Sequence, residues 1–115
     1  MRIVLPWPPS ELSPNKRQHW AKLAKAKKLY RAACATQARL QGLDRMASER
    51  LHLSLTFYPP TRRAFDLDNL LARMKSGLDG LADVIGVDDS RWSLAIQKAA
   101  EVGGYVEVTI TEQDT

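Results

Sequence analysis

Hydrophobic and polar positions alternate along residues 51–58, and every second side chain there is apolar. This alternation is typical of a β-strand with one covered face. The short segment Arg2-Ile3-Val4-Leu5 predicts a first strand. That strand must end at the prolines of residues 6–9, because proline fixes φ and restricts the residue before it.

A helical pattern begins near Lys16, where Ser13 or Asn15 could cap it, and Gly42 offers a C-terminal stop. Its apolar side chains are spaced by 3, 7 and 4 residues and form one stripe, made of Trp20, Leu23, Tyr30 and Cys34. Three lysines fall on another face of this helix: Lys22, Lys25 and Lys28. The pattern predicts an amphipathic helix with a basic exposed side.

A second helix opens at Asp66 or Asp68 and continues to about Leu81. Residues 91–101 and 105–111 then have the pattern of a β-hairpin joined through two glycines. The resulting β-α-β-α-β-β order predicts an α+β fold, in which a mixed β-sheet of about four strands packs against two helices. At 115 residues the chain fits a single domain, residues 1–115.

Charge is distributed unevenly along the chain. The first fifty residues contain 11 Lys and Arg against 3 Asp and Glu, a balance of +8, and the remainder has a balance of −4. A basic half joined to an acidic half suits a nuclease, since cations hold the phosphate backbone and carboxylates hold metal. A mixed solvated surface produces the same asymmetry, and charge alone favours that plainer interpretation.

Cysteine content and hydropathy limit the cellular setting. Cys34 is the only cysteine, so the chain forms no intrachain disulfide, and no apolar run approaches the length of a membrane span. We therefore expect a cytoplasmic protein without a membrane partner.

The segment Asp66-Leu67-Asp68-Asn69 is the most informative for chemistry. If its backbone is extended, residues two apart point the same way and both carboxylates converge. Such oxygen ligands suit Mg²⁺, which binds one or two carboxylates together with waters and phosphate. The alternative is that one aspartate caps the helix and the other favours its positive end, which is the commoner role for an isolated pair. Asp88-Asp89 follows about twenty residues later and offers a third carboxylate or an ordinary turn.

Lys75 follows Asp68 by seven residues, nearly two helical turns, and therefore shares its face. It could contact a phosphate, or it could form an i,i+4 ion pair with Asp79 worth about 0.3–0.5 kcal/mol. From sequence alone the ion pair ranks first. Structural roles are expected for the histidines, tryptophans and cysteine, namely His19, His52, Trp7, Trp20, Trp92 and Cys34.

Five short segments, in this order and spacing, resemble the RusA family of Holliday-junction resolvases. They are Leu5-Pro6-Trp7-Pro8-Pro9-Ser10, Asp66-Leu67-Asp68-Asn69-Leu70, Lys75-Ser76-Gly77-Leu78-Asp79-Gly80-Leu81, Val87-Asp88-Asp89 and Val106-Glu107-Val108-Thr109-Ile110-Thr111-Glu112. Each is weak alone, but together they span essentially the whole chain. The resemblance implies a homodimer that binds four-way DNA junctions and nicks two strands symmetrically with Mg²⁺.

The resemblance also assigns site residues. It implies Asp66, Asp68 and Asp89 as catalytic metal ligands and Lys75 as the family lysine. In the family that lysine lies about one turn after the second aspartate, where this chain has Ala72. Using Lys75 requires an insertion of three residues, nearly one helical turn, and Arg73 is a weaker substitute.

The expected function is therefore that of a Mg²⁺-dependent endodeoxyribonuclease that resolves Holliday junctions in DNA recombination and repair, without a nucleotide cofactor. The basic residues expected to contact DNA are Lys16, Arg17, Lys22, Lys25, Lys28, Arg62, Arg63 and Arg73. Two alternatives stay open. One is a non-catalytic module that binds branched DNA, and the other is a nuclease for other branched or flapped DNA.

Overall fold

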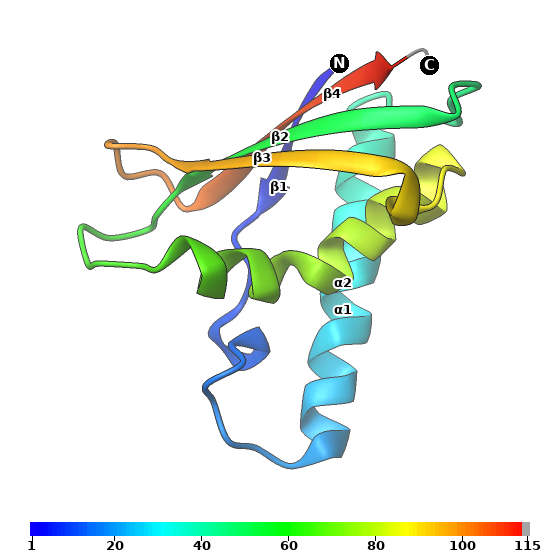
Figure 1. The fold of residues 1–115 in the computed structure, drawn as a ribbon. Coiled ribbons are helices and arrows are strands. Elements are labelled where there is room, and N and C mark those ends of the chain that lie inside the picture. Colours follow the sequence, from blue (N-terminus) through cyan, green and yellow to red (C-terminus); the bar gives the residue numbers. More distant parts are fainter. Residues whose placement is uncertain (114–115) are drawn as a thin grey trace.

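The computed structural model describes residues 1–113, which form a four-stranded sheet with both helices on one face (Figure 1). The α+β class, the mixed four-stranded sheet, the two helices and their predicted order are confirmed. In chain order the elements are β1 (Arg2–Pro6), η1 (Ser10–Leu12), α1 (Trp20–Leu40), β2 (Arg50–Tyr58), α2 (Leu67–Ile85), η2 (Asp89–Arg91), β3 (Trp92–Lys98) and β4 (Tyr105–Gln113).

The strands lie in the order β1-β4-β2-β3, with β3 parallel to β2 and β4 antiparallel to both β1 and β2. The predicted hairpin of the last two strands is therefore wrong, because β2 lies between them. Helix α2 acts as the crossover that brings β3 to the outer edge of β2, in parallel. The chain then passes the end of β2, where the amides of Gly103 and Gly104 donate to the carbonyls of Pro59 and Tyr58 at 2.8 and 2.7 Å.

Helix α1 begins four residues later than the sequence pattern predicts. His19 is its N-cap, and its Nδ1 accepts a hydrogen bond from the Ala21 amide at 3.2 Å. The loop before α1 is connected to η1 by a hydrogen bond that the Gln18 side-chain amide donates to the Glu11 carbonyl. As Figure 1 shows, the first turns of α1 project beyond the sheet. Trp20 is consequently 76% exposed, and its predicted place in the buried stripe is wrong.

The core lies between the sheet and the two helices. The four inward side chains of β2, at Leu51, Leu53, Leu55 and Phe57, are all buried, as the alternation predicts. Helix α2 continues four residues beyond its expected end and stops at Gly86 in the left-handed conformation, with φ of 80°.

The two helices cross at small residues. A Cβ added to Gly80 would lie 2.4 Å from the carbonyl oxygen of Arg31, and Gly77 faces the side chains of Tyr30 and Cys34. Burial raises the pKa of the Cys34 thiol to about 11, which agrees with its expected packing role. This close crossing holds α2 in place beneath the sheet.

Within residues 1–113, no helix combines the length and apolar character needed to cross a membrane.

Candidate active site

The proline-rich segment after β1 anchors the first half of α2. Trp7 packs edge-on against Phe57 and Phe65, with ring centroids 6.1 and 5.5 Å away. The Arg73 guanidinium lies 6.0 Å from the centre of the Trp7 ring and donates to the Pro8 carbonyl at 2.6 Å. These contacts join α2 to strands β1 and β2 and so position the acidic residues at its N-terminus.

Arg73 therefore has a structural role, and its predicted contact with DNA is not supported. Arg73 is only 7% exposed, and this burial lowers the pKa of its guanidinium. The reason is its face of the helix, which is turned toward Trp7 rather than toward solvent. It is equally poorly placed to serve as the catalytic lysine that the resemblance to the RusA family implies.

Asp66 and Asp68 line one hollow, together with Asn15 and Asn69; we call it the acidic hollow, and its remaining members are Pro14 and Leu67. The two residues do not both lie in extended backbone, which was the condition under which the sequence predicted that their carboxylates converge. Asp66 is extended at the N-cap position, with φ of −81° and ψ of 132°, and Asp68 lies in the first helical turn. Asp66 makes no capping hydrogen bond through its side chain. The capping alternative therefore lacks its defining contact.

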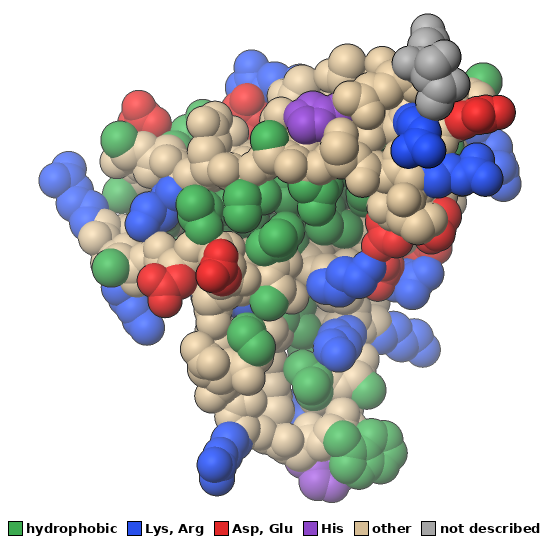
Figure 2. All heavy atoms as spheres, viewed as in Figure 1, with side chains coloured by type: hydrophobic (Ala, Val, Ile, Leu, Met, Phe, Trp, Pro, Cys, Tyr) green, Lys and Arg blue, Asp and Glu red, His purple; other side chains and the backbone are tan. Residues whose placement is uncertain are grey.

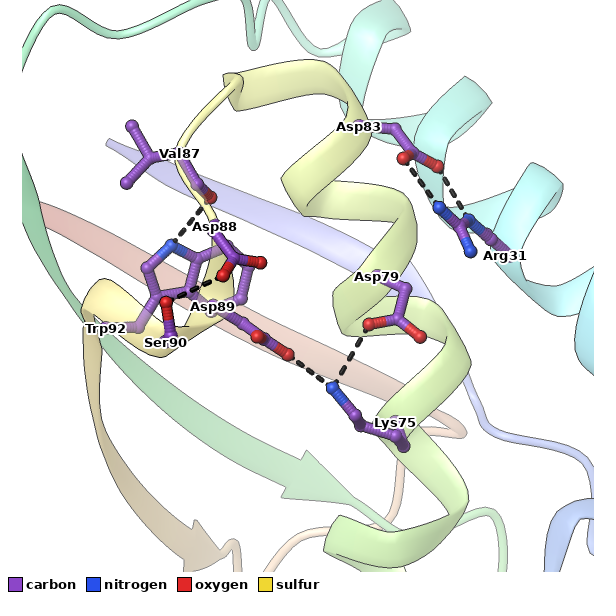
Figure 3. Close-up of polar contacts among 9 residues, drawn as sticks. All are labelled: Arg31, Lys75, Asp79, Asp83, Val87, Asp88, Asp89, Ser90 and Trp92. Atoms are coloured by element: carbon purple, nitrogen blue, oxygen red, sulfur yellow. Dashed lines mark hydrogen bonds and ion pairs between the residues drawn. The ribbon is translucent and has the colours of Figure 1, made fainter.

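Asp89 returns to the side of α2 after the chain reverses at Gly86. The indole of Trp92 donates to the Val87 carbonyl at 3.1 Å and so holds this turn. Figure 3 shows the result: the Lys75 ammonium lies between Asp79 and Asp89 and bonds to both. The predicted i,i+4 ion pair is present, at 3.1 Å, and the same ammonium group also holds Asp89.

Asp68, Lys75 and Asp89 line a common groove, here called the α2 groove. The predicted shared face of Asp68 and Lys75 is thus confirmed. The rest of the lining is largely apolar and consists of Leu71, Ala72, Leu78, Trp92 and Leu94. Figure 2 shows a hydrophobic band between the sheet and α2, with acidic side chains over the start of α2 and beside η2.

Hydrogen bonding differentiates the neighbouring acids. The bond to Asp89, with a smaller effect of Asp79, raises the pKa of the Lys75 ammonium, so this cation stays charged at neutral pH. Asp88 accepts a bond of 2.6 Å from the Ser90 hydroxyl, which lowers the pKa of its carboxyl. Asp88 is thus occupied within its own turn, whereas Asp89 faces the groove.

The carboxylates supply the oxygen donors that Mg²⁺ prefers. Within residues 1–113, however, no three acidic, histidine or cysteine side chains lie close enough together to hold a metal ion. The compact cluster expected of Asp66, Asp68 and Asp89 is therefore not formed; instead, Asp89 is held by Lys75. Mg²⁺ usually takes only one or two protein carboxylates, so the pair lining the acidic hollow fits its requirements.

Comparison with known proteins places the chain in a family. No protein-family model matches it. A protein of Xylella fastidiosa strain Temecula1, described as an uncharacterized protein, is 43% identical over 114 residues, which cover 95% of this chain and 74% of that protein. The chain belongs to the same family. The description of the Xylella relative states no activity, so function must be argued from the site.

Sequence reasoning missed part of this site. Trp92 and Leu94 form an apolar wall of the α2 groove, and Asn15 borders the acidic hollow. The position of Trp92, three residues after Asp89, was an available signal, whereas Asn15 is distant in sequence from the aspartates. The remaining predicted DNA contacts are exposed, namely Lys16, Arg17, Lys22, Lys25, Lys28, Arg62 and Arg63.

Proposed function

We propose that the protein is a Mg²⁺-dependent, structure-selective endodeoxyribonuclease that resolves Holliday junctions by paired symmetric nicks. The observation that carries this proposal is the α2 groove, in which Asp68, Lys75 and Asp89 come together from two separate segments. The resemblance of the sequence to the RusA family supplies the reaction and the substrate.

The side chains would divide the work. Asp66 and Asp68 would hold Mg²⁺ in the acidic hollow, and Asp89 would join them once Lys75 moves from Asp89 to the phosphate. The bound ion would supply an acidified water and polarise a phosphoryl oxygen. Lys75 would offset the negative charge that develops on the phosphate, since its ammonium group lies in the α2 groove with Asp68 and Asp89. Exposed cations such as Lys16 and Arg63 would contact flanking phosphates and set the position of the DNA.

A homodimer completes the proposal. A four-way junction has approximate two-fold symmetry, so two equivalent sites related by a two-fold axis can cut two equivalent strands. One monomer carries one α2 groove, and paired nicks therefore need a second copy.

The deciding experiment measures nicking of a labelled synthetic junction and a matched linear duplex, with Mg²⁺ and with EDTA. We expect Mg²⁺-dependent nicking of the junction alone. Asp68→Asn should slow it by at least about 100-fold, the usual effect of removing one group that stabilises the transition state. Asp44→Asn is the control, since Asp44 is exposed and lies outside the groove. Undiminished cleavage by Asp68→Asn would remove this residue from the mechanism.

One observation favours a second candidate, a module that binds branched DNA without cutting it. Lys75 already neutralises Asp89, and no three-carboxylate group forms within residues 1–113. Salt-sensitive binding of junctions without any nicking in Mg²⁺ would support this candidate. Nicking of flaps or other branches in place of junctions would indicate a nuclease of different specificity.

A further inference from the structure

Trp20 is the most exposed large hydrophobic side chain within residues 1–113, at 76%. It begins α1, at the end of the projection seen in Figure 1, and its ring lies 5.5 Å from that of His19 with an interplanar angle of 30°. Figure 2 shows hydrophobic atoms beside a histidine at this tip. The two rings therefore form an exposed aromatic platform that the fold itself does not use.

The platform lies in a strongly basic stretch. Residues 12–43 contain eight lysines and arginines and no aspartate or glutamate. Within residues 1–113, Arg31 is the one cation of this stretch that pairs with a carboxylate, namely Asp83. Lys16, Arg17 and Lys22 are all exposed near Trp20 in sequence. A polyanion is the partner that this combination fits, because phosphates neutralise the cations while bases stack on the aromatic rings.

The loop that leads to the projection adjoins the candidate active site. Asn15, in the loop that leads to Trp20, lines the acidic hollow with Asp66 and Asp68. The side-chain amide of Asn69 donates to the Ser13 hydroxyl at 3.1 Å, which ties the base of this loop to α2. A DNA strand that enters the acidic hollow would therefore pass the loop that carries Trp20.

We propose that Trp20 stacks on a DNA base left unstacked at the branch point of the bound substrate. The inference rests on the proposed function for its DNA substrate, but concerns binding and not cleavage. Continuous duplex offers no free base face, whereas a branch point interrupts stacking. Trp20 would thus favour branched over linear DNA, while the lysines bind both.

The test measures the affinity of the full chain for a junction and a matched duplex in EDTA, by fluorescence anisotropy. Trp20→Ala should weaken junction binding about tenfold or more, which is the range for the loss of one aromatic stack. Duplex affinity should change by less than about threefold, and Trp20→Phe should retain most junction affinity. Leu40→Ala is the matched control, since Leu40 is 75% exposed on the same helix, away from the loop. The slope of log Kd against log salt should be unchanged by Trp20→Ala, because the phosphate contacts remain.

A second measurement reports stacking directly. A 2-aminopurine base at the branch point should be quenched by the unmodified protein and by Trp20→Phe, and less so by Trp20→Ala. Unchanged junction affinity, or equal loss on junction and duplex, would overturn the inference. Dissociation of a dimer by Trp20→Ala without DNA would instead assign Trp20 to an interface between copies. Cleavage is scored separately, so a protein that binds through Trp20 but does not cut would refute only the proposed nuclease.

Discussion

Lys75 offers a matched pair of perturbations, because its ammonium holds two aspartates with different expected roles. Asp89 faces the α2 groove with Asp68, whereas Asp79 lies one helical turn after Lys75 and does not line the groove. Asp89→Asn and Asp79→Asn each remove one negative charge beside the same cation and keep the side-chain shape. Only the first removes a proposed catalytic carboxylate.

The two changes should cost similar stability. The side chain of Lys75 is 63% exposed, and those of Asp79 and Asp89 are 34% and 31% exposed, so solvent screens both pairs. Pairs of this kind contribute about 0.2–1 kcal/mol to the free energy of unfolding. For a domain of this size that corresponds to a fall in Tm of a few degrees at most, about 4 °C per kcal/mol. Thermal unfolding of both variants at neutral pH checks this first step.

Their effects on cleavage should differ widely. We expect Asp89→Asn to lower kcat on the synthetic junction at least about 100-fold, and Asp79→Asn to change it by less than about threefold. DNA affinity in EDTA should be equal or slightly higher for both variants, because each loses a negative charge near the phosphates. Equal loss of cleavage in the two variants would mean that the position of Lys75, and not the Asp89 carboxylate, limits the reaction. Full activity of Asp89→Asn would remove Asp89 from the site.

Two further predictions concern the scaffold. Gly80→Ala should lower the free energy of unfolding by about 2 kcal/mol, because an overpacking cost of about 3 kcal/mol exceeds the helix-propensity gain of about 1 kcal/mol. The added Cβ would lie 2.4 Å from the Arg31 carbonyl oxygen and 3.3 Å from the Ala35 amide nitrogen. Urea denaturation measures this loss, and an unchanged midpoint would contradict the close crossing of the helices. Asp83→Asn should destabilise the protein at pH 7 but not in strong acid, because Arg31 lowers the pKa of the Asp83 carboxyl in the folded state. The stabilisation from this ion pair is therefore present above the unfolded pKa of about 3.9 and is lost as the pH falls through the folded pKa. A stability difference that stays constant from pH 7 to pH 2 would contradict this pairing.

The local pattern of residues was sufficient to predict which helices and strands form and which face of an individual element a side chain occupies. The alternation along β2 predicted which side chains enter the core, and the seven-residue spacing predicted that Asp68 and Lys75 share a face. Both predictions follow from backbone geometry alone, since a strand repeats every two residues and a helix every 3.6. The ion pair of Lys75 with Asp79 was predictable for the same reason.

Only the tertiary structure decided which distant segments meet. The same sequence pattern suits a hairpin or a crossover, and pairing of β3 with β2 depends on where α2 delivers the chain. Arg73, which we expected at the surface, is buried, and Trp20, which we expected in the apolar stripe, is exposed. Burial depends on what packs against a helix face, and a helix end can project beyond the sheet. The approach of Asp89 to Lys75 likewise required the reversal at Gly86. Periodicity specifies the direction of a side chain within its own element, but the partner it meets is determined by the path of the whole chain.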